Sequence, residues 1–211
     1  MLDSSRLRQL VAGHCGVAVQ NVHAYIVGEH GDSEVPLWSS AMIGGVPLSR
    51  WKDADLLPLD TATRADISRR VVGGGDAVIA GKGFTNYAIS LATTRIIESV
   101  LYDEHQVLPV SSLIDDFIGI KDVCLSVPSV VNRNGVQRSL PVPLSACEAE
   151  ALQHSAEAVP NCHSAMRPVR VPSAPGSPCT RRSCCSLYPG PRPLFGRRRT
   201  PTRPRQRPRR D

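Results

Sequence analysis

Two short stretches near the start of the chain hold the side chains best suited to chemistry. In residues 2–8, Asp3 and Arg6 stand three positions apart, which places them on one face if the stretch is a helix. In residues 22–36, His30 lies in the glycine-containing motif GEHGDS. A histidine gives or takes a proton near neutral pH, a carboxylate orients its ring, and an arginine binds a carboxylate through two parallel hydrogen bonds. This set suits a small 2-oxo acid as substrate.

The same residues also have ordinary structural explanations. A histidine in a glycine-containing turn is often structural only, and Asp3 and Arg6 alone form a surface pair worth under about 1 kcal/mol. Composition and spacing alone therefore do not establish an active site.

The elements that must position these residues follow from the hydrophobic pattern, which predicts a mixed α and β body over residues 1–159. Helices are expected over residues 2–12, 60–81, 85–102 and 145–159, and strands over 21–28, 35–47 and 107–144. Three consecutive glycines at 73–75 interrupt the second helix, and residues 132–135 suit a hairpin turn. Ser145 and Glu148 form a predicted capping box.

The chain changes character after residue 159. Residues 1–159 carry a net charge of −6, whereas residues 160–211 carry +12, with thirteen arginines and eleven of the 18 prolines. This composition cannot bury a core, so we predict a disordered tail, read most simply as neutral or as translated from a wrong frame. Nucleic-acid binding through phosphates is the functional alternative, but few aromatic residues accompany the arginines, so a nucleic-acid partner is not expected.

Targeting and metal-binding signals are weak. No apolar run reaches the roughly 18 residues of a membrane helix, and the start lacks the pattern of a signal peptide. The seven cysteines form no recognisable disulfide or zinc pattern, so no metal site is expected. These features predict a cytoplasmic protein with reduced thiols and no membrane partner.

Several motifs in a fixed order resemble the L-lactate dehydrogenases of bacterial type, within the lactate/malate dehydrogenase family. Besides the two stretches above, they are VPLWS at 35–39, GKGFTNYAI at 81–89, GIKDV at 119–123 and LSVP at 125–128. The resemblance covers residues 2 to about 159 and implies the C-terminal, substrate-binding domain of that family. The expected fold is α+β, with antiparallel sheets packed against long helices.

The resemblance also assigns roles to single residues. It implies that His30 protonates the oxygen of pyruvate as hydride arrives, and that Asp3 stabilises its imidazolium form. Arg6 matches the residue that binds the substrate carboxylate. Thr85 matches a hydroxyl in the substrate pocket, and Ile89 matches an apolar contact to the nicotinamide.

Two further positions imply regulation. Arg8 and His23 match the basic pair that binds fructose 1,6-bisphosphate across a subunit interface in allosteric bacterial members, where a symmetric partner doubles the charge. The alternative is that Arg8 is a solvated helix residue and His23 an ordinary strand residue. The family is expected to form homotetramers.

The implied function is that of an L-lactate dehydrogenase fragment, an NAD-dependent enzyme of fermentative glycolysis that interconverts pyruvate and L-lactate. Glu29 before the histidine favours lactate over malate as substrate. The 211 residues contain no Gly-x-Gly-x-x-Gly turn, so we expect the N-terminal Rossmann domain to be absent and the isolated chain to have little or no activity. The alternatives are an inactive subunit that acts as an oligomer-interaction module, and a malate or other 2-hydroxy-acid dehydrogenase.

Overall fold

The computed structural model describes residues 1–51 and 59–159, which form a mixed body of helices and small antiparallel sheets. The predicted α+β class, with antiparallel sheets packed against long helices, is therefore confirmed. The tail predicted for residues 160–211 lies outside the described residues. Within the described ranges, no helix is both long and apolar enough to span a membrane.

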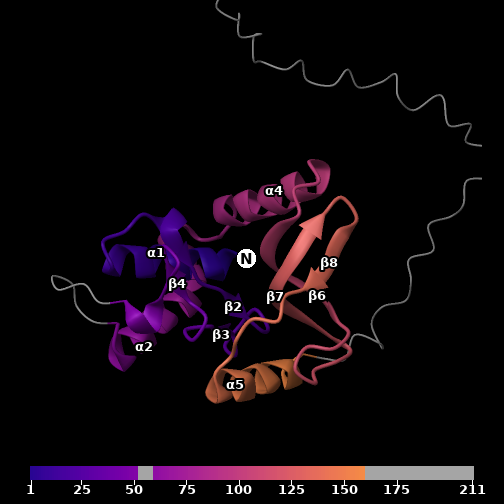
Figure 1. The fold of residues 1–211 in the computed structure, drawn as a ribbon. Coiled ribbons are helices and arrows are strands. Elements are labelled where there is room, and N and C mark those ends of the chain that lie inside the picture. The colour runs from indigo at the N-terminus through magenta and orange to yellow at the C-terminus, as the bar shows by residue number, and fades with distance from the viewer. Residues whose placement is uncertain (52–58, 160–211) are drawn as a thin grey trace, which may run out of the picture. The chain divides into compact units, whose positions relative to one another are not determined.

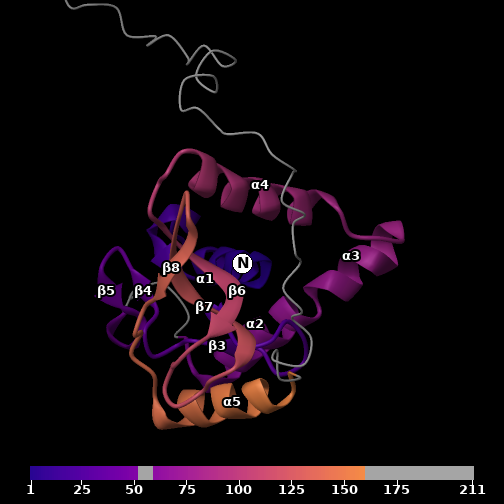
Figure 2. The ribbon, with the colours of Figure 1, turned by 90° about the vertical axis from the view of Figure 1, so that its right-hand side faces the viewer.

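The largest of the described sheets consists of strands β6 (Gln106–Ile114), β7 (Val123–Asn132) and β8 (Gly135–Ser139), with β7 in the centre. Val110 lies opposite Val127, and the tight turn at residues 132–135 joins β7 to β8 as the sequence predicts. Helix α4 (Tyr87–Leu101) lies beside one end of this sheet and α5 (Ala146–Glu157) beside the other (Figures 1 and 2).

The two predicted N-terminal strands are each broken, which corrects the sequence-based expectation. Residues 21–28 form β1 (Val22–His23) and β2 (Ile26–Val27), because β1 pairs with β4 (Met42–Ile43) whereas β2 pairs with β3 (Val35–Pro36). The segment over residues 35–47 likewise becomes β3, β4 and β5 (Val46–Pro47), and the predicted turn at Gly44 and Gly45 joins the last two. Hydrophobic composition indicated the strands but not their change of partner.

Strand β2 separates two hydrophobic cores. Ile26 packs into the first, which contains residues of α1 (Leu2–His14) and α2 (Thr61–Val72). Val27 points the other way, into a second core with residues of β7 and with Leu152 of α5. Neighbouring side chains of a strand face opposite sides, so β2 is fixed from both. The loop that carries His30 begins directly after this strand.

The helices follow the sequence pattern, with two refinements. The predicted helix over 60–81 is broken at Gly73 into α2 and α3 (Gly74–Lys82), so the glycine triplet marks a helix boundary. The apolar stripe of the predicted helix at 85–102 is present on α4, but of the residues described there only Ser99 is buried. The predicted capping box at Ser145 and Glu148 is confirmed at the start of α5.

Candidate active site

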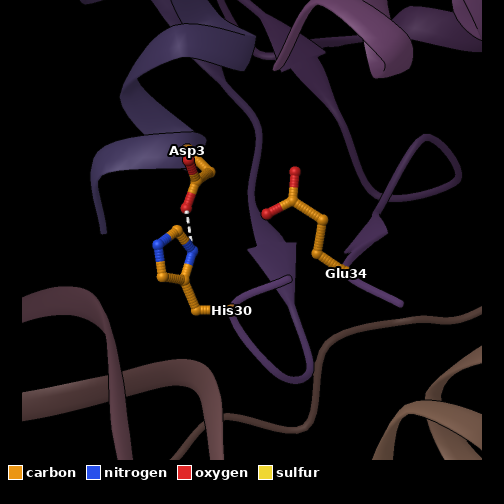
Figure 3. A group of neighbouring side chains, drawn as sticks. All are labelled: Asp3, His30 and Glu34. Carbon is orange, nitrogen blue, oxygen red and sulfur yellow. Dashed lines mark ion pairs between the residues drawn. The ribbon is translucent and has the colours of Figure 1, made fainter. Parts of the chain in front are cut away.

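Asp3 and His30 are in direct contact. The Nδ1 atom of His30 lies 3.0 Å from Oδ2 of Asp3 (Figure 3). The Asp3 side chain is only 11% exposed, whereas the His30 side chain is 82% exposed. A buried carboxylate therefore holds one ring nitrogen, and the rest of the ring is accessible, which is the arrangement that a proton-transferring histidine requires.

Arg6 contacts the other oxygen of the same carboxylate. Its Nη1 atom donates to Oδ1 of Asp3 at 2.8 Å, across the i, i+3 spacing that the sequence predicts. Asp3 thus lies between a fixed cation and a titratable ring. A guanidinium carries five N–H donors, so this bond leaves Arg6 with further donors for an anionic ligand.

Hydrogen bonds to three serines that are distant in the sequence tie the segment carrying His30 to α1, β7 and α5. Ser4 of α1 accepts from the N–H of Ile26 at 2.9 Å, which fixes the first turn of α1, and with it Asp3, against β2. Gly28 exchanges two backbone hydrogen bonds with Ser126 of β7, of 2.9 and 3.0 Å. Ser155 of α5 accepts from the N–H of Glu29 at 2.9 Å.

The loop is also closed on itself. The carboxylate of Glu29 accepts from the hydroxyl of Ser33 at 2.8 Å and from its backbone N–H at 3.2 Å. His30 lies between these two residues. The hydrogen bonds to other elements and those within the loop together hold the His30 backbone in place before a ligand binds. Less entropy is therefore lost on binding.

A cleft of about 830 Å³ contains the predicted catalytic and substrate-binding residues. Thr85 and Ile89 line it together with Asp3, Arg6 and His30, so the structure brings all five together although up to 86 positions separate them. Thr85 lies just before α4, and Ile89 lies in its first turns with 49% of its surface exposed. One wall of the cleft is therefore polar and acidic, and the wall formed by α4 is apolar.

Two residues of this site were not identified from the sequence as functional. Glu34 lines the cleft beside Asp3 and His30, and its Oε1 atom is buried with no hydrogen-bond partner among the described residues. Ser155 is fully buried behind the loop. Glu34 directly follows the GEHGDS motif that carries His30, so its position was the available signal, whereas no local signal marks Ser155.

The electrostatic environment of Glu34 is unusual. Burial, followed by repulsion from Asp3, raises the pKa of Glu34 from an ordinary 4.5 to about 7, against the smaller opposing effect of Arg6. This carboxyl group therefore changes charge in the same pH range as a typical histidine.

The two residues predicted to bind a sugar bisphosphate lie on neighbouring elements. Arg8 donates to the carbonyl oxygen of Ser4 at 3.3 Å and to the hydroxyl of Ser5 at 3.2 Å. His23 is exposed on β1, opposite Met42. Their role stays a prediction.

Comparison with known proteins agrees with this geometry. Residues 1–162 match the family model described as the lactate/malate dehydrogenase, alpha/beta C-terminal domain. An L-lactate dehydrogenase of Bifidobacterium animalis subsp. lactis is 55% identical over 157 residues, covering 74% of this chain and 49% of that protein. An L-lactate dehydrogenase of Moorella thermoacetica is 45% identical over 157 residues, covering 74% and 50%.

Solved structures show the same likeness in three dimensions. The minor L-lactate dehydrogenase of Enterococcus mundtii superposes with a TM-score of 0.71 at 34% identity, covering 74% of this chain and 50% of that one. The chain thus spans about half the length of the relatives that it matches. The extent of the family match and the agreement in fold establish that the chain belongs to the lactate/malate dehydrogenase family, in its alpha/beta C-terminal domain.

Proposed function

We propose that this chain is the substrate-binding and proton-transferring half of an NAD-dependent L-lactate dehydrogenase. The observation that carries the proposal is the shared carboxylate of Asp3, with His30 at 3.0 Å on one oxygen and Arg6 at 2.8 Å on the other, in the wall of one cleft. The names of the relatives support lactate as the substrate.

His30 supplies the proton. In its imidazolium form it donates from the exposed part of the ring to the carbonyl oxygen of pyruvate, which becomes the hydroxyl of lactate. The Asp3 carboxylate stabilises the positive charge of the ring before this step. In the reverse direction the neutral ring accepts the proton from the lactate hydroxyl.

Arg6 fixes the orientation of the substrate. Its remaining N–H donors bind the carboxylate of the 2-oxo acid, while the bond to Asp3 prevents the guanidinium from turning away. This grip, together with the hydroxyl of Thr85 in the same cleft, would hold the carbonyl group near His30.

The residues present fit one part of the cofactor. Ile89 leaves about half of its surface exposed toward the cleft, which suits the apolar face of a nicotinamide ring. When bound, NADH supplies the hydride. The 211 residues contain no Gly-x-Gly-x-x-Gly turn, and Ile89 is the residue to which we assign a cofactor contact.

The direct test is a chimeric enzyme. Residues 1–157 of this chain would be joined to the half of the Bifidobacterium animalis relative that the chain does not match, and pyruvate-dependent loss of NADH absorbance would be measured. The chimera should be active. His30→Asn should lower kcat by about 10²–10⁴, because general acid catalysis is worth that much. Arg6→Lys should raise KM for pyruvate about tenfold or more, because lysine cannot bind a carboxylate through a planar fork.

His154→Asn is the matched control, because His154 is similarly exposed at 79% but lies near the end of α5 beside Glu157. It should leave kcat and KM unchanged. A folded chimera without activity, or one whose activity survives His30→Asn, would contradict the proposal. The unfused chain should be inactive, and pyruvate-dependent NADH oxidation by it that His30→Asn abolishes would refute that expectation.

Regulation by fructose 1,6-bisphosphate is a finer part of this proposal. It is supported by the location of Arg8 on α1 and of exposed His23 on β1, two elements that pack against each other. In a tetrameric chimera, the double substitution Arg8→Gln with His23→Gln should abolish activation by the sugar bisphosphate. Unchanged activation would remove this part of the proposal alone.

A further inference from the structure

Glu34 is a second carboxylate beside the Asp3–His30 pair. A nitrogen of His30 and carboxylate oxygens of Asp3 and Glu34 all lie within 4.8 Å of one another. Figure 3 shows the Glu34 carboxylate beside the ring and the Asp3 carboxylate, reaching the cluster from the segment that follows the His30 loop. The three groups come from two separate parts of the chain, residue 3 and residues 30–34.

The hydrogen-bonding pattern distinguishes the two carboxylates. Asp3 is satisfied on both oxygens, by Arg6 and by His30. Glu34 has a buried Oε1 atom with no partner among the residues that the structure describes. A buried carboxylate oxygen without a donor makes the ionised form costly, so the charge of Glu34 depends on the cations close to it.

The charged and titratable groups that act on Glu34 come from α1 and from the His30 loop. Asp3 and Glu29 disfavour its ionised form, whereas Arg6 and the amino group of Met1 favour it. Arg6 keeps its charge at every relevant pH, so the cations near Glu34 whose charge can change are the amino group of Met1, whose pKa burial lowers, and the imidazole of His30. Because the imidazole lies in the same cluster as the Glu34 carboxylate, the charge of one group acts on the other.

We propose that Glu34 and His30 form a coupled proton-binding pair, in which the Glu34 carboxylate stabilises the His30 imidazolium and His30 in turn permits Glu34 to ionise. With His30 neutral, only Arg6 and the amino group of Met1, among the described residues, offset the repulsion from Asp3 and Glu29, so Glu34 keeps its proton to a higher pH. With His30 protonated, two carboxylates share the positive charge of the ring. Glu34 therefore sets the pH range over which His30 holds the proton that it would donate.

This inference rests on the proposed function only for the statement that the His30 proton is donated to a substrate. The coupling itself belongs to the chain as it stands and requires neither substrate nor cofactor. Two groups whose interaction exceeds about one pH unit titrate as a pair, in steps that belong to both.

The test is an NMR titration of the imidazole of His30 in the full chain, from pH 5 to 9 at fixed salt. Glu34→Gln preserves the shape of the side chain and removes its charge. Because the two groups lie within 4.8 Å of each other and His30 is exposed to solvent, the midpoint of His30 protonation should move down by about one pH unit. Asp32→Asn is the matched control, because Asp32 is an exposed carboxylate two positions from both residues. It should move the midpoint by less than a third of that amount.

A reciprocal measurement covers the case in which Glu34→Gln does not fold. In His30→Asn, which alters an exposed side chain, the ¹³C signal of the Glu34 carboxyl should titrate at higher pH than in the unaltered chain. Equal shifts for Glu34→Gln and Asp32→Asn, or a Glu34 titration that is the same with and without His30, would overturn the proposal. Because neither measurement involves NADH or pyruvate, an inactive chimera would refute the proposed function without deciding this coupling.

Discussion

Replacing Gly28 with alanine tests how the His30 loop is held, because this residue is constrained in two independent ways. Its φ angle is +94°, a conformation that costs a residue with a side chain about 1–2 kcal/mol or more. A Cβ atom at this position would also lie 2.4 Å from Oγ and 3.1 Å from Cβ of Ser155. The backbone cannot yield easily, since its N–H and carbonyl groups are both bonded to Ser126.

The expected loss of stability follows from these terms. Overpacking against Ser155 adds about 1–3 kcal/mol to the backbone term, so Gly28→Ala should lower the free energy of unfolding by about 2–5 kcal/mol. Urea unfolding followed by circular dichroism measures it directly. Gly13→Ala is the control, because Gly13 lies inside α1 with nothing within 4 Å of an added Cβ, and the change should stabilise the chain by about 0.5–1 kcal/mol.

A double-mutant cycle separates the two constraints. Ser155→Ala alone should cost about 1–3 kcal/mol, because the N–H of Glu29 loses its acceptor. In the double variant the 2.4 Å contact is gone, so the combined cost should be about 1–2 kcal/mol less than the sum. Two results would contradict this account of the loop. The first is that the losses of stability in Gly28→Ala and Ser155→Ala add to within about 0.5 kcal/mol in the double variant. The second is that Gly28→Ala does not destabilise the chain relative to Gly13→Ala.

Three further predictions concern stability. Burial and the charge of Asp3 raise the pKa of Glu34 to about 7, so the folded chain loses stability as the pH rises from about 4.5 to 7. Glu34→Gln should therefore stabilise it at pH 8 by about 1–2 kcal/mol, a value reduced for partial exposure, and much less at pH 4, as urea unfolding at the two pH values would show. Burial raises the pKa of Glu148, but hydrogen bonds from serine hydroxyl and backbone N–H groups outweigh it and lower the pKa overall. Its contribution is thus present above pH 4.5 and lost as the pH falls, and Glu148→Gln should cost about 1–3 kcal/mol at pH 7 but little at pH 3. Leu152→Ala, at a fully buried position between α5 and β7, should cost about 2–5 kcal/mol in the same assay, whereas Leu113→Ala, 48% exposed, should cost under about 1 kcal/mol.

The sequence predicted the helices well because their signals are local. The capping box at Ser145 and the glycines at 73–75 act on the residues next to them, and both mark helix boundaries in the structure. The apolar stripe of α4 was also visible in the sequence. The pattern alone does not say what the stripe contacts; the family resemblance placed Ile89 at the site, and in the structure Ile89 and Ile96 both line the cleft.

The strands were predicted less well for a related reason. Alternation of side chains indicates that a segment is extended, but not which strand it pairs with. Ala24 and Tyr25 carry the chain from a pairing with β4 to a pairing with β3, and their side-chain types do not record this change. The consequence for the site is considerable, since the break places Ile26 and Val27 between two cores just ahead of the His30 loop.

In the candidate site, too, local sequence signals indicate the reactive side chains but not the residues that surround them. The types and spacing of Asp3, Arg6 and His30 indicated chemistry that they could do, and the family resemblance singled them out from ordinary structural residues. Glu34 and Ser155 act on His30 only through distances that packing creates: one lies within 4.8 Å of the ring nitrogen, and the other accepts the hydrogen bond of the residue before it. A protein with the same motif but without Glu34 should therefore keep the same acid and lose it to deprotonation at a lower pH. The residue types thus indicate the proton transfer that we propose, whereas the distances that packing creates determine which charges surround His30.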